Sequence, residues 1–278
     1  MRITNKYAVC EETAEIAQRA VYRPQKDVFR VTELINPPMI RHLTLQHWDD
    51  LSVDVADLLW SIFGTDVHAK MEQIRKPNIV KEMHMEVPLD CDKILRGTVD
   101  LVDLLSRTIS DYKTTSVFKV LKGEFADYEM QINFYNYLLH RLGFPPMTRG
   151  RNILFLKDWA ASKAKFQDDY PKTQEAVIWY DLWPIDKTKH VLDGRIHAHL
   201  DKPKVCSPAE RWEEPTTYAV MKRGRKSALP NGLKNDPQEA EAMANKVGGY
   251  VEMREGRCRR CEDYCVVRKF CPFGRNLP

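Results

Sequence analysis

Apolar residues recur along the chain with two different spacings, and each spacing indicates a different kind of element. In 52–74, 128–142 and 185–200 they return every three or four positions, which is the period of one face of an α-helix. Shorter helices are predicted over 11–20 and 237–246. The three long stretches are expected to bury one face against the rest of the protein.

Short runs of β-branched and aromatic residues between turn-forming residues predict strands. Two such runs within 94–114 predict a β-hairpin with a polar turn at Ser106-Arg107. The other predicted strands are 81–89, 152–157, 176–183, 216–221 and 250–253. From residue 52 to 200 the order is helix, three strands, helix, two strands, helix. This order predicts an α/β fold in which helices flank a mixed sheet.

The pattern changes near residue 203. Before it the elements are long and regular, and after it come short β-like runs, one helix and a cysteine-rich tail. We therefore predict two parts, a core over 1–202 that includes an N-terminal helical segment, and a small basic, cysteine-rich subdomain over 203–278.

Composition narrows the class of protein only slightly. The 278 residues are 43% hydrophobic and 29% charged, which is typical of a soluble globular protein. The net charge of +4 is too small to indicate a nucleic-acid partner by itself. The chain shows neither a signal-peptide pattern nor an apolar run long enough for a membrane span, so a cytoplasmic protein without membrane contact is expected. It also lacks a phosphate-binding loop, so no ATP-driven motor is expected.

The hairpin brings charged residues together. If its turn is centred between residues 105 and 106, Asp100 faces Asp111, and Lys113 lies on the same face. Opposed side chains lie about 5 Å apart, where two carboxylates repel unless a cation lies between them. Magnesium or manganese would suit such a pair, and the arrangement fits hydrolysis of a phosphodiester. The alternative is a solvated hairpin with scattered charges.

The neighbourhood of the hairpin adds further residues in a recognisable order. The segments are Gly64-x-x-x-His68, Gly97-Thr98-Val99-Asp100, Asp111-Tyr112-Lys113 and Gln131-x-x-x-Tyr135. Together they resemble the PD-(D/E)XK nuclease superfamily in its RecB-like branch. That branch includes CRISPR-associated adaptation nucleases, helicase-linked nucleases and many bacteriophage exonucleases. The resemblance implies a restriction-endonuclease-like fold and, with no motor in the chain, a phage exonuclease.

The resemblance also implies a role for each matched residue. The implied metal ligands are His68, Asp100, Asp111 and the main-chain carbonyl of Tyr112. Lys113 would orient the attacking water, while Gln131 and Tyr135, one helical turn apart, would position the scissile phosphate. Taken alone, His68 fits a hydrogen-bonded core histidine better than a ligand.

Four of the seven cysteines are crowded near the end of the chain, at Cys258, Cys261, Cys265 and Cys271. Four thiolates can hold a structural zinc ion or a 4Fe-4S cluster, and their chemistry does not choose between the two. The resemblance favours an iron-sulfur cluster held by the last three of these residues and one distant cysteine. Cys206 is the preferred fourth ligand, and Cys258 is the rival.

A basic cluster in a glycine-containing turn is the other feature of the C-terminal part. Its residues are Lys222, Arg223, Arg225 and Lys226. Such a cluster fits contact with nucleic-acid phosphates, and it fits a solvated turn equally well.

These features predict a divalent-metal-dependent DNA exonuclease that acts on single strands or duplex ends, in phage or bacterial DNA recombination, repair or degradation. Its candidate partners besides DNA are a helicase, a recombinase or a single-strand-binding protein. The alternatives are an endonuclease or a CRISPR-type end-processing nuclease, or a non-catalytic zinc-containing DNA-binding protein.

Overall fold

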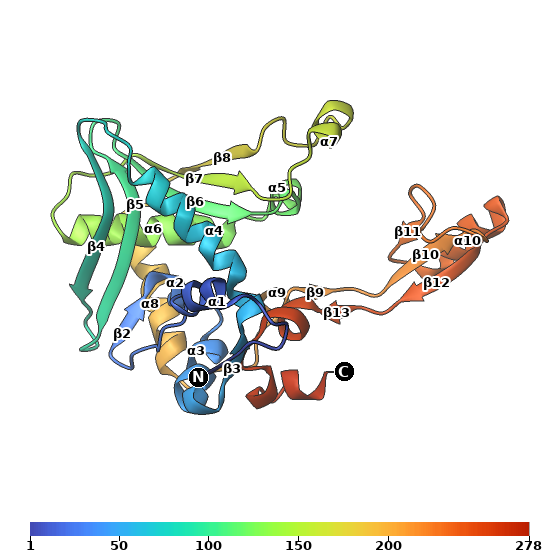
Figure 1. Ribbon diagram of the computed structural model, residues 1–278, viewed down its shortest axis with the longest axis horizontal. Coiled ribbons are helices and arrows are strands. Elements are labelled where there is room, and N and C mark those ends of the chain that lie inside the picture. The colour runs from blue at the N-terminus through green and yellow to red at the C-terminus, as the bar shows by residue number, and fades with distance from the viewer. Residues whose placement is uncertain (278) are drawn as a thin grey trace. The chain divides into compact units, whose positions relative to one another are not determined.

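The computed structural model describes residues 1–277, and the chain divides into two compact units, Met1–Pro203 and Lys204–Pro278. The first unit contains a mixed sheet flanked by helices, and the second contains the cysteine-rich region (Figure 1). The predicted fold class is therefore confirmed. Every helix within 1–277 is too short or too polar to cross a lipid bilayer.

The sheet of the first unit has six strands, in the order β2-β5-β6-β7-β8, with β4 also paired to β5. The strands are β2 (Val28–Arg30), β4 (Ile79–Pro88), β5 (Ile94–Asp103), β6 (Thr108–Thr115), β7 (Arg149–Leu156) and β8 (Glu175–Asp181). The pairs β2–β5 and β6–β7 are parallel, and the others are antiparallel. A separate parallel pair joins β1 (Arg2–Thr4) to β3 (Ser52–Asp54).

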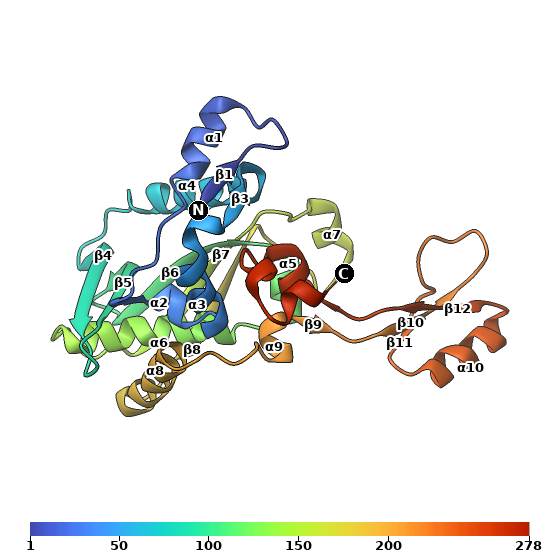
Figure 2. The same ribbon diagram turned by 90° about the horizontal axis from the view of Figure 1, so that it is seen from below.

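Helices cover both faces of this sheet (Figures 1 and 2). On one face, α4 (Val55–Met71) packs against Leu101, Tyr112 and Ile153 of the central strands. On the other face lie α6 (Ala126–Arg141) and α8 (Ile185–Leu200), which pack on each other and on the main core. The middle of α6 is buried throughout from Gln131 to Leu139, because this helix lies between the sheet and α8.

Shorter helices complete the first unit. They are α1 (Glu11–Gln18), α2 (Val31–Leu34), α3 (Pro38–His47), η1 (Trp48–Asp50), α5 (Val117–Lys122) and α7 (Ala161–Phe166). The sequence analysis predicted no element over the range of α3. Pro38 occupies the first turn of the helix, where proline costs no hydrogen bond.

Two predicted boundaries are corrected. The long helix begins at Val55 rather than at residue 52, because the Asp54 carboxylate accepts a hydrogen bond from the Ala56 N–H and caps the helix. The hairpin turn spans four residues, 104–107, rather than two, because the Asp103 carboxylate accepts hydrogen bonds from two N–H groups within the turn. Its centre is unchanged, so the paired residues follow the predicted register.

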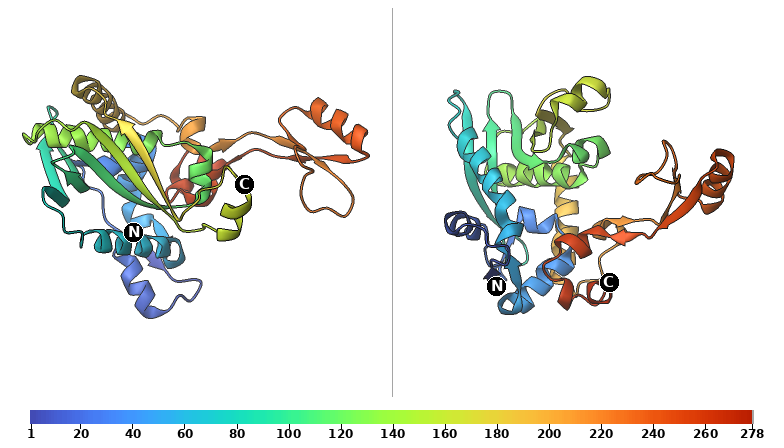
Figure 3. Two further views of the ribbon diagram at one scale, coloured as in Figure 1. Left: turned by 90° about the horizontal axis from the view of Figure 1, so that it is seen from above. Right: turned by 45° about the vertical axis from the view of Figure 1, so that its right-hand side comes forward.

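The second unit has its own small sheet, in which β10 (Thr217–Met221) lies between β11 (Leu233–Lys234) and β12 (Tyr250–Arg254). Helix α10 (Pro237–Val247) lies beside this small sheet (Figure 3). Its Ala240 and Ala244 pack against Val220 of β10. The remaining elements are α9 (Pro208–Arg211), β9 (Glu213–Glu214), β13 (Arg257–Cys258), η2 (Arg260–Tyr264), η3 (Arg268–Phe270) and η4 (Gly274–Asn276).

Gly150 of β7 allows α6 to lie directly on the sheet, because a Cβ atom there would collide with Cγ2 of Ile132. We expect Gly150→Ala to lower the free energy of unfolding by about 1–3 kcal/mol through overpacking. Urea denaturation followed by circular dichroism measures this. Gly194→Ala in α8 is the control, since its Cβ would meet no atom within 4 Å and alanine favours a helix. Equal stability of the Gly150→Ala variant and the wild type would contradict the prediction.

Candidate functional site

Three carboxylates occupy one row across three neighbouring strands. The β4–β5 ladder pairs the residues on both sides of Glu82 and Asp100, so its register sets these two opposite each other. The β5–β6 ladder ends at Leu101 and Ser110, so Asp100 and Asp111 are the next residues beyond its last pair. Side chains at opposed positions of adjacent strands lie about 5 Å apart when they share a face. The sequence analysis predicted the second of these relations and missed Glu82.

The strands are distorted at this row. The β4–β5 ladder keeps its register on both sides of Glu82 but omits that position, and Glu82 has a φ of +43°, in the left-handed region that non-glycine residues seldom adopt. Alternation of side chains is also interrupted on β5. Val99 and Val102 both pack in the core beneath α6, whereas strict alternation would put residues three apart on opposite faces. At this row, therefore, β4 and β5 do not follow the regular pleat of a β-sheet.

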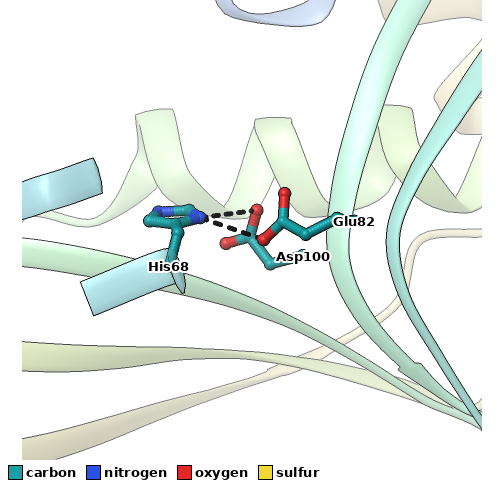
Figure 4. Close-up of side chains that lie close together, drawn as sticks. All are labelled: His68, Glu82 and Asp100. Atoms are coloured by element: carbon teal, nitrogen blue, oxygen red, sulfur yellow. Dashed lines mark hydrogen bonds and ion pairs between the residues drawn. The ribbon is translucent and has the colours of Figure 1, made fainter. Parts of the chain in front are cut away.

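Helix α4 supplies a histidine to the row (Figure 4). His68 Nδ1 lies 3.3 Å from Glu82 Oε1 and 3.5 Å from Asp100 Oδ1, and one ligand atom of each residue lies within 4.8 Å of the others. The His68 ring rests edge-on against the Tyr112 ring, with centroids 5.9 Å apart. Two carboxylate oxygens and an imidazole nitrogen are a donor set that suits manganese or magnesium, so the residues fit a divalent cation.

Asp100, in the middle of the row, is the most perturbed of the three carboxylates. Burial, followed by the charge of Asp111, raises the pKa of Asp100 to about 8. The main-chain N–H of Tyr112 donates to Asp100 Oδ2 at 2.6 Å and opposes this shift. A buried carboxylate in such surroundings is a group whose charged form a cation would stabilise.

Asp111 is buried and has other partners. Its carboxylate accepts from Lys113 Nζ at 2.8 Å, from Gln131 Nε2 at 3.1 Å and from Asn152 Nδ2 at 2.7 Å. The Gln131 amide also donates to the Tyr135 hydroxyl at 2.7 Å. The structure thus brings together Asp111 and the residues of two predicted motifs, and it adds Asn152. The chemical roles assigned to these residues stay predictions.

Lys113 carries the positive charge of the site. Burial lowers the pKa of its ammonium, but the charge and hydrogen bond of Asp111, with the charge of Asp100, together raise it by more, so the pKa lies above its usual value. The ammonium also lies 5.5 Å from the centroid of the Tyr128 ring. Lys113 therefore stays charged at neutral pH and is held beside Asp111.

An open edge of β5 adjoins the row. Strand β4 occupies one edge of β5, while the other edge pairs with β2 over 94–96 and with β6 over 101–103. Among the described strands, none pairs with 97–100 on that second edge. A cavity of about 400 Å³ lies there, and its polar lining residues include Arg30, Thr32, His84, Arg96, Thr98 and Tyr135. Glu86 also lines the cavity and forms an ion pair with Arg96 at 2.5 Å, so Arg30 is the cation there that this carboxylate does not pair, and the cavity can still accept an anion.

In the second unit, the predicted cluster ligands influence one another. Burial raises the pKa of the Cys206 thiol to about 12, with further contributions from Glu210 and from Cys271, Cys261 and Cys265. The pKa of Cys261 is raised to about 11 by burial, then by Cys265, Cys258 and Cys271. Cys206 is affected by all three of the other predicted ligands and Cys258 affects Cys261, so both remain candidates for the fourth ligand. Such mutually repelling thiolates fit a zinc ion or an iron-sulfur cluster.

The predicted basic cluster lies in the turn that follows β10. Gly224 has a φ of +81°, which the turn requires, and the four basic side chains around it are all exposed. They are Lys222, Arg223, Arg225 and Lys226. Their exposure permits contact with phosphates, and their role in nucleic-acid binding stays a prediction.

Two site residues escaped the sequence analysis. Glu82 could have been found by extending the register argument to the strand before the hairpin, but that required the length of the turn between β4 and β5. Asn152 lies opposite Asp111 in the parallel β6–β7 ladder. Those two strands are joined through α5 and α6, so no local pattern in the sequence reveals their register.

Comparison with known proteins adds little to this description. No family model matches the chain, and no curated protein matches it. Among solved structures, the crystal structure of SSO0001 is similar over 73% of this chain and 89% of that chain, with 14% sequence identity and a TM-score of 0.49. That likeness is too slight to support an argument about activity, so the functional proposal rests on the residues of the site.

Proposed function

We propose that the protein is a divalent-metal-dependent DNA nuclease, and specifically an exonuclease that acts on single strands or duplex ends. The observation that carries the proposal is the row of Glu82, Asp100 and Asp111, with His68 at one end and Lys113 at the other. Carboxylates that hold a cation beside a fixed ammonium are what hydrolysis of a phosphodiester requires.

The divalent cation would be held by His68, Glu82 and Asp100, whose ligand atoms already converge. In this respect the proposal differs from the ligand set implied by the resemblance, because Glu82 replaces Asp111 in the group of converging atoms. Asp111 and the Tyr112 carbonyl adjoin this group as further candidate ligands. When bound, magnesium or manganese supplies positive charge that stabilises the negative charge developing on the phosphate.

The remaining residues position the reactants. The Lys113 ammonium, fixed by Asp111, would donate to the attacking water or to a phosphate oxygen. Gln131 and Tyr135 are hydrogen-bonded to each other and would hold the scissile phosphate from the α6 side. Arg30, in the cavity beside β5, would offer charge to a neighbouring phosphate of the same strand, while Arg96 there is paired with Glu86.

Exonuclease rather than endonuclease action follows from the resemblance to the RecB-like branch, as does a place in DNA recombination or repair. A helicase, a recombinase or a single-strand-binding protein would then supply or protect the DNA. The basic cluster at 222–226 would contact the phosphates of that DNA.

We expect Asp111→Ala to abolish DNA cleavage, by at least about 100-fold, while DNA binding survives, because the variant frees Lys113 and removes a buried carboxylate. Digestion of DNA labelled separately at each end, with magnesium or manganese, measures this and reveals the polarity. Asp181→Asn, an exposed carboxylate on β8, is the control and should cleave like the wild type. Intact DNA with the wild type and both variants would support the non-catalytic alternative.

Glu82→Gln tests the ligand set separately. Because Glu82 contributes one of the converging oxygens, we expect the manganese concentration for half-maximal cleavage to rise roughly tenfold or more. A titration of activity against manganese, repeated with Asp181→Asn, measures the shift. An unchanged titration curve would remove Glu82 from the ligand set and leave the role of Asp111 untouched.

For the cysteine site we propose a 4Fe-4S cluster held by Cys206, Cys261, Cys265 and Cys271, with zinc as the alternative. Purification without oxygen should give a brown protein, and Cys206→Ser should lose most of its iron whereas Cys258→Ser keeps it. Cys10→Ser, an exposed cysteine of the first unit, is the control. A colourless protein that contains zinc would exclude the cluster. Loss of iron in Cys258→Ser alone would make Cys258 the fourth ligand.

A further inference from the structure

A second cavity lies beside α4 and has the opposite chemistry from the polar cavity. It has a volume of about 390 Å³, and its walls are mostly apolar. We name it the α4 groove, and its main lining residues are Phe63, Val67, Lys70, Met71, Phe155 and Lys157.

The α4 groove adjoins the candidate metal site through two elements. Val67 in its wall is the residue before His68 on α4, and Thr114, which also lines it, follows Lys113 on β6. A chain lying in the groove would therefore lie beside the histidine end of the carboxylate row, whereas the Lys113 side chain points to the opposite face of the sheet, toward Asp111 and Tyr128.

Two exposed aromatic rings lie at or beside this groove, Phe63 in its wall and Trp60 against Phe63 and the groove residue Lys157. Trp60 and Phe63 are 56% and 55% exposed, lie one helical turn apart on α4, and have ring centroids 5.4 Å apart. The Lys157 ammonium lies 3.8 Å from the centroid of the Trp60 ring. Large aromatic side chains left this open to water, beside an apolar cavity, are typical of a binding surface.

We propose that the α4 groove binds unpaired bases of single-stranded DNA and leads the strand to the metal site. Bases stack on Trp60 and Phe63, while Lys70 and Lys157 face the phosphates. The bases of a duplex are already stacked and paired, so an apolar groove with stacking rings favours a single strand or an overhang. Asp66 also lines the groove, and the two lysines outweigh its charge.

Lys70 and Lys157 favour a nucleic-acid strand over an apolar protein segment as the occupant of the groove. An apolar segment of a partner protein would use the hydrophobic walls but would gain nothing from two ammonium groups beside stacked rings. A nucleic-acid strand uses both. The inference rests on the proposed nuclease function for the direction in which the strand runs, but the binding itself can be measured without cleavage.

The test measures the affinity for a fluorescent single-stranded oligonucleotide and for a blunt hairpin duplex by anisotropy, without added divalent cation. We expect Trp60→Ala and Phe63→Ala each to weaken single-strand binding about tenfold, with a much smaller effect on the duplex. Trp60→Phe should keep most of the affinity, because it retains a stacking ring. Trp179→Ala is the matched control, since Trp179 is an exposed tryptophan of β8 whose ring also faces cations, those of Arg149 and Arg151.

Unchanged single-strand affinity in both alanine variants would overturn the proposal and leave the groove to an apolar segment of a partner protein. An equal loss in Trp179→Ala would also overturn it, since binding would then not be specific to this groove. If the nuclease proposal alone is wrong, the wild type would still bind the single strand through the groove. It would leave that strand uncut when magnesium or manganese is added.

Discussion

Repulsion between carboxylates is the constraint on which the rest of the site depends. Folding places Glu82, Asp100 and Asp111 on three adjacent strands in one row. The protein offsets the charge at the two ends by different means, with His68 near Glu82 and with Lys113 and two amides around Asp111. The middle of the row receives the least compensation. Asp100 has a raised pKa of about 8 there, and this is where a cation would stabilise the folded protein most.

The distorted strands are part of the same arrangement. A left-handed residue such as Glu82 costs about 1–3 kcal/mol and persists only when its surroundings enforce it. The surroundings are apolar and lie on both sides, with α4 packed on Leu101 and Tyr112 and α6 packed on the opposite face. Because both helices bury large apolar surfaces, the sheet can keep an irregular row of polar groups between them.

Much of this arrangement follows from local patterns in the sequence. The centre of the hairpin fixes the relation between Asp100 and Asp111, and the i, i+4 spacing fixes Gln131 and Tyr135 on one face of α6. What could not be predicted depends on chain segments that are distant in sequence or locally strained. Glu82 reaches the site through an unusual backbone angle, which no propensity indicates.

Asn152 shows the other kind of limit. It contacts Asp111 only because β7 pairs in parallel with β6, and a parallel register is set by the packing of the intervening helix rather than by a turn. Helix α3, over which no element was predicted, begins at Pro38, and proline is compatible with the first turn of a helix but not with its interior, so its presence alone does not locate a helix.

The two ends of the row differ in their access to solvent, and this difference indicates the side from which a substrate would approach. Asp111 is 1% exposed, whereas the His68 and Glu82 side chains are 34% and 29% exposed. The two cavities lie on different faces of the sheet, one against Tyr135 of α6 and the other against Val67 of α4, the residue before His68. One cavity is lined by arginines and the other by aromatic rings. These are the complements of the two chemical parts of a nucleic-acid strand, its phosphates and its bases, so the two faces of the sheet offer different contacts to a strand that approaches the row.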